Sequence, residues 1–420
     1  MTNISRAKVR IISGLATLKG KDMSKLDELI QQYCPDGVEW KKYYDVCDLI
    51  RGITYNKNQE AKTKKEDAYK VLRANNITLY LNTLNFDDVK LVSKDVVVKP
   101  EQYLYAGDIL MCAGSGSKEH VGKVAYIFQN MDYTFGGFMA VVRCKEDVIP
   151  RYMFHILASH YFTSHLETQI NSSTINNINR QVMQSFVFPV PPLPVQEEIV
   201  RILDAFTELQ AELQAELQKR KQQYNYYLDN LLNFKNINRG GQAEVRWMKM
   251  SEVCNSVCSG KNRIKKPNGE YPVFGSTGII SYCDKYAFDK TQILVARVGA
   301  NAGYVQIANN KYDVSDNTLI IDLRNDIELN LKYVYYILRY INLNKYAKGG
   351  GQPLITAGEL KRISIPIPAF SEQQRIVSIL DRFDTLTTDL THGLPAEIEK
   401  RRQQYEYYRD KLLTFKRKEA

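Results

Sequence analysis

The clearest pattern of apolar positions covers residues 195–234, a stretch without glycine or proline. Its apolar residues recur three or four positions apart, which predicts an amphipathic helix. About 40 residues at roughly 1.5 Å each make a helix of about 60 Å, which is too long for one wall of a small domain. The apolar positions are Ile199, Ile202, Leu203, Phe206, Leu209, Leu213, Leu217, Tyr224, Leu228 and Leu231.

The same pattern occurs a second time at residues 371–416. Residues 199–206 and 376–383 agree at six of eight positions, and residues 222–234 and 403–415 agree at nine of thirteen. An internal repeat of this kind predicts two similar units. We expect the two long helices to pack as an antiparallel pair related by a pseudo-twofold axis. The alternative is that each helix packs only on its own domain.

The regions ahead of the helices also correspond. Trp40 and Trp247, the only tryptophans, stand at the same place in each half. From Trp40 to Pro189 is 149 positions and from Trp247 to Pro366 is 119, so the first half carries 30 more residues (149 minus 119). We place this excess in the lysine-rich region 56–100.

Short strand-like runs with turns fill both of these regions, at residues 121–128, 138–143, 292–296 and 317–323. The sequence therefore predicts a mixed α/β (α+β) fold with two globular domains and two long helices. The expected boundaries are an N-terminal extension at 1–22, a first domain at 23–190, a first long helix at 191–235, a linker at 236–243, a second domain at 244–368 and a second long helix at 369–420.

Charge and composition narrow the class of partner. Lys and Arg total 57 against 47 Asp and Glu, a net charge of +10, which favours a polyanion. The 28 tyrosines suit wet interfaces and contacts to bases. The chain is expected to have no membrane partner, because no run approaches the ~20 apolar residues of a membrane span.

The seven cysteines are irregularly spaced and odd in number. We interpret them as reduced thiols of a cytoplasmic protein and not as a disulfide framework. Cys254 and Cys258 lack a second pair for a metal site, and we expect no metal. The short apolar run near the start lacks a clear cleavage site, so no signal peptide is predicted.

Taken together, the repeated features resemble the specificity subunit of Type I restriction enzymes. Each half has a variable domain, prolines ahead of the helix, the pattern Gln-x-x-Ile-Val-x-Ile-Leu-Asp-x-Phe, and a tail such as Lys-Arg-Arg-Gln-Gln-Tyr-x-Tyr-Tyr-Arg. The opening run from Leu26 to Trp40 also looks typical of the family. The resemblance covers nearly the whole chain from about Met23 to Phe415.

The resemblance implies a non-catalytic, DNA-binding role. Each variable domain would be a target-recognition domain that reads half of a bipartite, asymmetric double-stranded DNA site. The two helices would set the spacing and dock two adenine-methylating modification subunits, and motor-nuclease restriction subunits would join the larger complex. The chain itself would need no cofactor, since S-adenosylmethionine, ATP and Mg²⁺ belong to the partner subunits.

Searching the residues for catalytic motifs agrees with this expectation. The chain contains no P-loop, no Asn-Pro-Pro-[Phe/Tyr] methyltransferase motif and no Gly-x-Gly-x-x-Gly after a strand. His155, His160 and His165 recur every five residues, which does not place them on one helix face. Two alternatives remain at this stage: a free-standing sequence-specific DNA-binding regulator, and a self-contained nuclease with unrecognised active residues.

Candidate DNA contacts lie in two loops of the first domain. The glycine-containing turn at residues 114–118 can bring backbone N–H groups near a phosphate. The polar loop at residues 172–181 offers side chains that read bases, since Asn reads adenine and Arg reads guanine. The candidates are Ser115, Ser117, Lys118, His120, Asn176, Asn177 and Arg180.

The second domain offers corresponding loops. Arg297 to Asn301 matches the glycine-containing turn, and Gly349 to Gln352, followed by Thr356, matches the polar loop. A basic run follows Cys258. The candidates here are Lys261, Arg263, Lys265, Arg297, Asn301 and Gln352, with Lys266 in the same run.

The ends of both long helices carry tyrosines beside basic triplets, at residues 219–221 and 400–402. The tyrosines cover more than one helix face, so we expect contacts both with the sister helix and with a further partner. The candidates for partner binding are Tyr224, Tyr227, Tyr405 and Tyr408, with Tyr226 and Tyr407 between them.

A tetrapeptide repeat with leucine at every fourth position spans residues 208–218. The second helix has the same rhythm with one more repeat unit, and the offset between the copies rises from 177 to 181. Gly393 and Pro395 predict a kink in the second helix. The repeat suggests that this part of the helix sets the spacing between the DNA half-sites.

Overall fold

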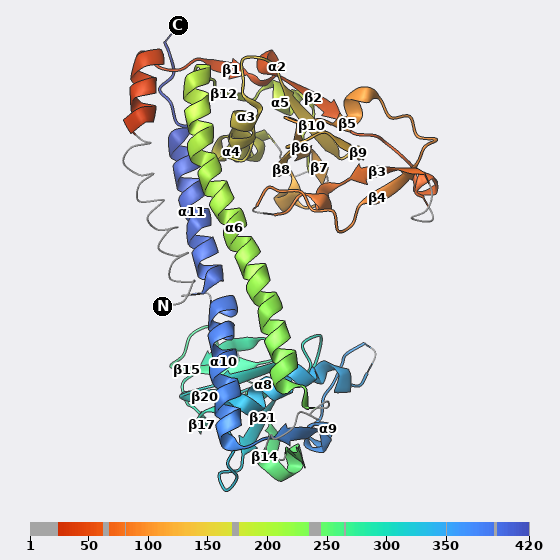
Figure 1. Cartoon of the computed structure of the whole chain (residues 1–420), viewed down its shortest axis with the longest axis vertical. Coiled ribbons are helices and arrows are strands. Elements are labelled where there is room, and N and C mark those ends of the chain that lie inside the picture. Colours follow the sequence, from red (N-terminus) through yellow and green to blue (C-terminus); the bar gives the residue numbers. More distant parts are fainter. Residues whose placement is uncertain are drawn as a thin grey trace. The chain divides into compact units, whose positions relative to one another are not determined.

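The computed structural model of the chain describes residues 24–61, 67–79, 81–169, 176–234, 245–263, 266–349, 351–389 and 393–419. The predicted N-terminal extension and linker lie outside the described residues, as does the candidate Lys265. The chain divides into two compact units (Figure 1). Unit 1 is Met1–Glu212 with Ile398–Ala420, and unit 2 is Leu213–Glu397.

The repeated helical pattern forms α6 (Leu193–Leu232), α10 (Phe370–Thr388) and α11 (Leu394–Leu412). The prediction of long helices is confirmed for α6, whose 40 residues are shared between the two units. The second copy is two helices and not one kinked helix. Gly393 allows the break, because a Cβ there would lie 2.6 Å from the carbonyl oxygen of Asp389 and 2.7 Å from that of Thr385.

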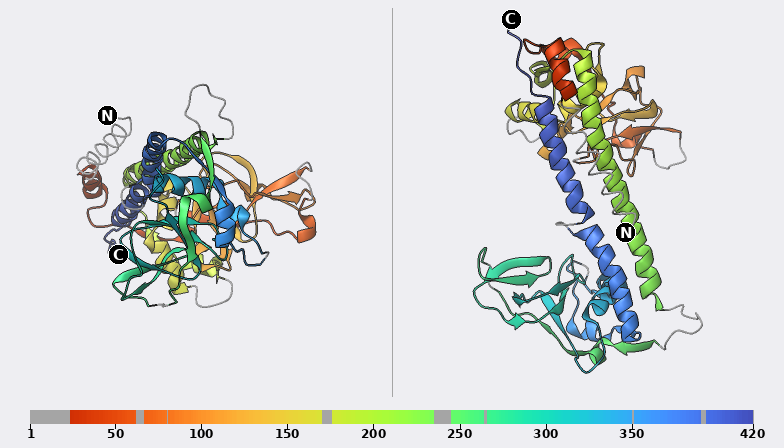
Figure 2. Two further views of the ribbon diagram at one scale, coloured as in Figure 1. Left: turned by 90° about the horizontal axis from the view of Figure 1, so that it is seen from below. Right: turned by 60° about the vertical axis from the view of Figure 1, so that its left-hand side comes forward.

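Each unit contains part of both copies of the helical pattern (Figure 2). In unit 1, α11 packs antiparallel to the first half of α6 (Figure 1), and Tyr408 stacks on Phe206 with ring centroids 5.4 Å apart. In unit 2, Tyr227 in the second half of α6 packs on Phe383 of α10, with a centroid distance of 5.1 Å. The predicted contact between the helix copies is therefore confirmed within each unit.

Unit 1 contains two four-stranded sheets with the orders β2-β10-β6-β8 and β4-β3-β9-β5. The first comprises β2 (Cys47–Arg51), β6 (Ile109–Cys112), β8 (Val124–Tyr126) and β10 (Met139–Cys144). The second comprises β3 (Ala68–Leu72), β4 (Lys90–Ser93), β5 (Tyr103–Leu104) and β9 (Met131–Phe135).

Short elements connect these sheets to the helices. Two strand pairs are β1 (Trp40–Lys42) with β12 (Val187–Pro189) and β7 (Gly114–Ser115) with β11 (Asn176–Asn177). The helices are α2 (Tyr43–Val46), α3 (Pro150–Leu157), α4 (His160–Gln169) and α5 (Arg180–Gln184). Single 3₁₀ turns lie at Lys57–Gln59, Ala74–Asn76, Pro100–Gln102 and Lys118–His120.

Unit 2 repeats this arrangement, with the sheet orders β14-β21-β18-β19 and β16-β15-β20-β17. The strands are β14 (Cys254–Ser259), β15 (Tyr271–Gly275), β16 (Gly278–Cys283), β17 (Phe288–Asp289), β18 (Gln292–Ala296), β19 (Val305–Ala308), β20 (Lys311–Val314) and β21 (Thr318–Leu323).

The connecting elements of unit 2 also match. The strand pair is β13 (Arg246–Lys249) with β22 (Ser364–Ile367), the helices are α7 (Met250–Val253), α8 (Leu331–Ile341) and α9 (Ala357–Arg362), and a 3₁₀ turn lies at Leu343–Tyr346. The predicted mixed α/β class with two sheet-rich domains is confirmed. All seven cysteines carry free thiols, and no described helix combines the length and apolar character needed to cross a membrane.

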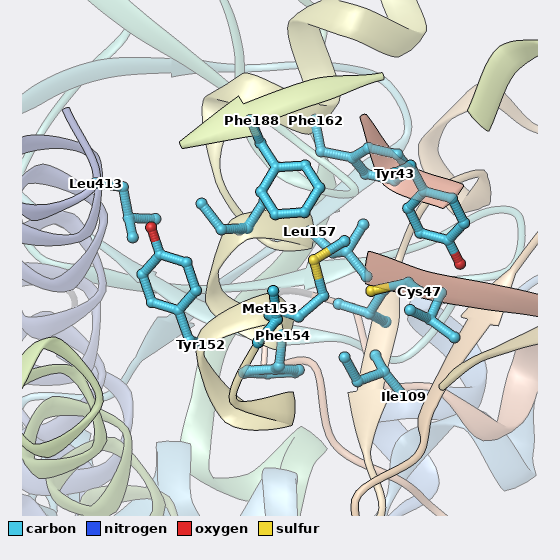
Figure 3. Packing of buried hydrophobic residues seen from close by; sticks show 14 of the residues in the cluster. Tyr43, Cys47, Ile109, Tyr152, Met153, Phe154, Leu157, Phe162, Phe188 and Leu413 are labelled. Atoms are coloured by element: carbon cyan, nitrogen blue, oxygen red, sulfur yellow. The ribbon is translucent and has the colours of Figure 1, made fainter. Parts of the chain in front are cut away.

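The main core of unit 1 lies between α3, the first sheet and the two long helices (Figure 3). Tyr152 and Met153 of α3, Phe188 of β12 and Leu413 after α11 are buried together. Each such side chain removes enough apolar surface from water to contribute about 1.5–3 kcal/mol. The helices are therefore part of the domain core and not an appendage to it.

Buried hydrogen bonds join the first turn of each long helix to its own domain. In unit 1, the Gln196 side chain accepts from the backbone N–H of Ile149 at 2.9 Å and donates to the Asp147 and Pro191 carbonyls at 3.0 and 2.8 Å. In unit 2, the Gln373 side chain accepts from the Asn330 N–H at 2.8 Å. It donates to the carbonyls of Glu328 and Pro368 at 3.2 and 3.0 Å. The same set of hydrogen bonds therefore joins helix and domain in both units.

Candidate nucleic-acid interface

The two predicted loops of the first domain come together in the structure. Strand β7 pairs with β11, with Ser115 opposite Asn176 and Gly114 opposite Asn177. The backbone N–H of Ile178 donates to the carbonyl of Ala113 at 2.7 Å. The loop after β6 and the loop before α5 therefore form one surface, although more than 50 residues separate them in sequence.

An arginine that the sequence analysis did not select fixes the second of these loops. Arg51, the last residue of β2, donates through Nη2 to Asn177 Oδ1 at 3.1 Å and also to the carbonyl of Ile178. Burial lowers the pKa of Arg51, opposed by the nearby Tyr44 hydroxyl. The candidate Arg180 packs over the Tyr44 ring at 5.5 Å. Asn177 and Arg180 are thus engaged within the unit.

Beside this loop surface lies a cavity of about 1130 Å³. The candidates Ser115 and His120 line it, whereas Ser117 and Lys118 are exposed and do not. Its remaining lining residues come from the segments after β2, β3 and β9, from β7 and the residue after it, and from the start of β10. They are Ile53, Thr54, Tyr55, Arg73, Ala74, Asn75, Asp88, Gly114, Gly116, Gly136, Gly137, Phe138 and Met139.

Three polar side chains of the segment after β3 line the cavity together. Arg73 Nη2 and Asn75 Nδ2 both donate to Asp88 Oδ2, at 2.7 and 2.9 Å. Among the described residues, Arg73 Nε and His120 Nδ1 are buried and have no hydrogen-bond partner. Phe138, at the rim, is 67% exposed. The excess residues predicted in the region 56–100 were the only sequence signal for Arg73, Asn75 and Asp88.

The predicted loops of the second domain also meet. Val298 forms a β-bridge with Leu354, and the Ile355 N–H donates to the carbonyl of Arg297 at 2.9 Å. Arg297 also donates through Nη1 to Ser259 Oγ at 3.3 Å. Asn301 and Gln352 are exposed in these loops.

Thr356 has a structural role in this surface. Its hydroxyl accepts from the Glu359 N–H at 3.2 Å and donates to Glu359 Oε2 at 2.9 Å, which caps α9. Thr356 was predicted to lie beside the base-reading candidates, but these bonds occupy its hydroxyl. Asn179 caps α5 at the corresponding place in unit 1.

The basic run of unit 2 follows β14 directly and lies beside the Arg297 loop. Lys261 and Arg263 are exposed, and Arg263 Nε lies 3.4 Å from Asp316. Lys266 pairs with Asp284 at 2.8 Å. Such exposed pairs contribute little to stability, so these cations remain available to a polyanion.

The tyrosines of the long helices divide into buried and exposed positions. Tyr224 and Tyr405 are only 7% and 6% exposed, and burial raises the pKa of Tyr405 to about 12. This burial argues against the prediction that these two residues bind a partner. The exposed positions are Tyr226 and Tyr407, at 67% and 63%.

Of the other two predicted partner-binding tyrosines, Tyr227 is 38% exposed and Tyr408 is partly buried. Tyr227 packs on Phe383, and Tyr408 stacks on Phe206. The alternation follows from helix geometry, because neighbouring residues differ by about 100° around the axis. Sequence alone identified the tyrosine clusters but not which ring faces outward.

Comparison with known proteins agrees with this architecture. The family model for the type I restriction modification DNA specificity domain matches residues 35–241 and 242–400. A putative type I restriction enzyme specificity subunit of Haemophilus influenzae is 31% identical over 403 residues, covering 90% of this chain and 96% of that protein. The Escherichia coli EcoR124I/EcoR124II specificity subunit is 38% identical over 258 residues, covering 55% of this chain and 62% of that protein.

A solved structure supports the fold. The crystal structure of the S subunit of a type I restriction–modification system from M. genitalium superposes with a TM-score of 0.58 at 15% identity, covering 90% of this chain and 96% of that one. The family model matches twice, once for each sheet-rich domain. The chain therefore belongs to the family of type I restriction–modification DNA specificity subunits.

Proposed function

We propose that this chain recognises a bipartite site on double-stranded DNA, one half-site for each unit, and performs no chemistry itself. The observation that carries the proposal is that both units have the same arrangement of strands but different side chains on equivalent loops. The strand orders of the two units correspond. Ser115 and His120 in the loop of unit 1 have Gly299 and Asn301 as their counterparts in the loop of unit 2. One scaffold with two loop chemistries suits two different base sequences.

The exposed cations support contact with DNA phosphates. Lys118 in unit 1 and Lys261 and Arg263 in unit 2 extend from loops beside the candidate base-reading residues. Phosphate contacts fix the register of a protein on DNA, and base contacts supply the sequence preference. The binding should therefore weaken as salt rises, because each neutralised phosphate releases a counterion.

The helices serve, in this proposal, as the scaffold for the other subunits. Two adenine-methylating modification subunits dock on the two helix pairs, and restriction subunits join the assembly. S-adenosylmethionine, ATP and Mg²⁺ act in those subunits. The repeated exposed tyrosines Tyr226 and Tyr407 support a surface of the same chemistry in each unit.

Mapping methylated adenines by single-molecule sequencing, in cells with and without this gene, tests the proposal. We expect N6-methyladenine at one two-part sequence with a fixed spacer, only when the gene is present, and co-purification with a methyltransferase. Purified chain that cleaves or methylates DNA alone would establish an enzyme instead. Specific binding to a single operator without any partner would indicate a regulator.

A further inference from the structure

The two units can be compared position by position because their sheets share one register. In unit 1, Leu72 of β3 pairs in parallel with Phe135, and in unit 2, Phe274 of β15 pairs in parallel with Val314. In unit 1, the residue directly after Leu72 is Arg73, and we compare it with the residue directly after Phe274. In unit 2 it is Gly275.

A second contact confirms this alignment. A Cβ on Gly52 would lie 2.2 Å from the carbonyl oxygen of Phe135, and a Cβ on Gly260 would lie 2.2 Å from that of Val314. Both glycines are therefore required by the same close approach of two strands. Arg73 and Gly275 therefore occupy equivalent positions relative to the close approach at Gly52 and Gly260.

The units differ most at this place. In unit 1, residues 73–89 connect β3 to β4, whereas in unit 2 only Ser276 and Thr277 connect β15 to β16. The unit 2 hairpin carries the exposed apolar side chains of Ile279 and Ile280. The unit 1 segment instead supplies polar side chains to the cavity.

Buried bonds hold the unit 1 segment in place. The Asn76 side chain is fully buried, accepts from the Arg73 N–H at 2.9 Å, and donates to the carbonyls of Asn85 and Asp88 at 3.1 and 3.2 Å. Asp88 in turn orients the Arg73 guanidinium. A side chain fixed before binding loses less conformational entropy when it binds a ligand.

Two side chains that line the cavity each contain a buried polar atom without a hydrogen-bond partner. A buried donor without a partner costs about 1–3 kcal/mol, so Arg73 Nε and His120 Nδ1 require an explanation. Both atoms belong to side chains that line the same cavity. Satisfying either atom requires its side chain to shift when a ligand enters the cavity.

We infer that this cavity is the base-reading site of unit 1, in which Arg73 recognises guanine and His120 contacts a base edge. The inference rests on the proposed function and specifies which residues determine one half-site. Guanine presents two acceptors, O6 and N7, to the arginine fork in the major groove. Unit 2 has Gly275 at the matched position and reads its half-site with other residues.

The test maps N6-methyladenine in cells that express the full chain with the methyltransferase that co-purifies with it. Arg73→Ala should relax the preference for guanine at one position of one half-site by about tenfold or more. The other half-site and the spacer should stay unchanged. His120→Asn should alter the same half-site.

Lys70→Ala is the matched control, because this exposed lysine lies on β3, three residues before Arg73, and does not line the cavity. Its ammonium contacts exposed Asp132 at 3.5 Å and the Tyr133 ring at 5.3 Å. Lys70→Ala should leave the methylated sequence unchanged. If Arg73→Ala fails to assemble, Arg73→Lys keeps a cation for Asp88 and removes the fork, and His120→Asn gives an independent result from a second lining residue.

The outcomes separate the inference from the proposed function. No bipartite methylated sequence with the unaltered chain would reject the proposed function. A bipartite sequence that stays the same in the assembled Arg73 and His120 variants would reject the inference alone. A change in both half-sites would also reject it, since the cavity belongs to unit 1.

Discussion

His155 lies fully buried in α3, where Nε2 contacts Asp204 of α6 at 3.0 Å and Nδ1 contacts the Tyr405 hydroxyl of α11 at 3.0 Å. Unit 2 has Tyr336 at the matched position, three residues after the buried tyrosine of its helix, and Tyr336 donates to Asp381 at 2.7 Å. One position of the repeated frame is therefore filled by two different donors.

Burial is the main reason that the pKa of His155 falls to about 4, and the hydrogen bond to Asp204 opposes it in part. In the unfolded chain the pKa of histidine is near 6.5. Between these values the unfolded state binds a proton that the folded state does not. The stabilising effect of neutral His155 is complete above about pH 6.5 and is lost as the pH falls toward 4.

We predict that His155→Tyr removes this pH dependence. When the pH falls from 7 to 5, the free energy of unfolding of unit 1 with His155 should decrease by on the order of 2 kcal/mol. The tyrosine variant should not show this decrease in the free energy of unfolding. Urea unfolding followed by Trp40 fluorescence, in a Trp247→Phe background, measures it. The control His160→Gln should keep the loss, since His160 is exposed. An equal loss in His155→Tyr would contradict the prediction.

The matched glutamines Gln196 and Gln373 give a second prediction at this scale. Each is fully buried and satisfies one N–H and two carbonyls in its own unit. Replacing either by alanine leaves those groups unpaired and should destabilise that unit by about 3 kcal/mol.

Hydrogen exchange of the buried strands reports on each unit separately. Gln196→Ala should speed exchange in β6 and leave β18 unchanged, and Gln373→Ala should do the reverse. Each variant serves as the control for the other. Equal acceleration in both strands from either variant would mean that the junctions are not independent.

At the scale of elements, α6 is continuous where its sister copy is divided. The repeat at residues 208–218 lies within α6, which passes from unit 1 to unit 2 between Glu212 and Leu213. Four added residues turn a helix by about 40° beyond one full turn, so the apolar face is nearly kept. They also lengthen the helix by about 6 Å.

We therefore predict that inserting one Glu-Leu-Gln-Ala unit into α6 lengthens the preferred DNA spacer by about one or two base pairs, at ~3.4 Å each, with both half-sites unchanged. Methylation mapping of the assembled variant measures the spacer. Glu212→Ala, which keeps the helix length, should leave the spacer as it is. An unchanged spacer after the insertion would reject this role of the repeat.

At the scale of the whole molecule, each unit exposes one tyrosine at the same place on its helix. Tyr226 and Tyr407 each stand two residues after the buried tyrosine of their pattern. We predict that Tyr226→Ala and Tyr407→Ala each weaken the binding of one modification subunit, and that the double variant weakens both. Truncating an aromatic anchor at an interface typically costs about 2 kcal/mol or more of binding.

Native mass spectrometry of the purified complex measures this stoichiometry. Tyr226→Ala and Tyr407→Ala should fold normally, because both side chains are exposed. Tyr224→Ala should lower the stability of unit 2, because Tyr224 is buried. A double variant that still holds two modification subunits at unchanged affinity would move the docking surface elsewhere.

The sequence by itself determined the features that depend on local periodicity and on the repeat. Apolar positions three or four apart specify a helix wherever the chain lies, so α6 was predicted closely, and the runs at 292–296 and 317–323 correspond to β18 and β21. The repeat also predicted two similar units and the candidate loops that meet in each.

The tertiary structure alone decided which side chains face a common space. Arg73 and His120 are 47 residues apart and line one cavity. The parallel pairing of β3 with β9 is a long-range contact that no local pattern encodes. Burial of Tyr224 and exposure of Tyr226 depend likewise on where the neighbouring helix packs. The periodicity of apolar residues determines a helix or strand, whereas the pairing of distant helices and strands determines which side chains form a site.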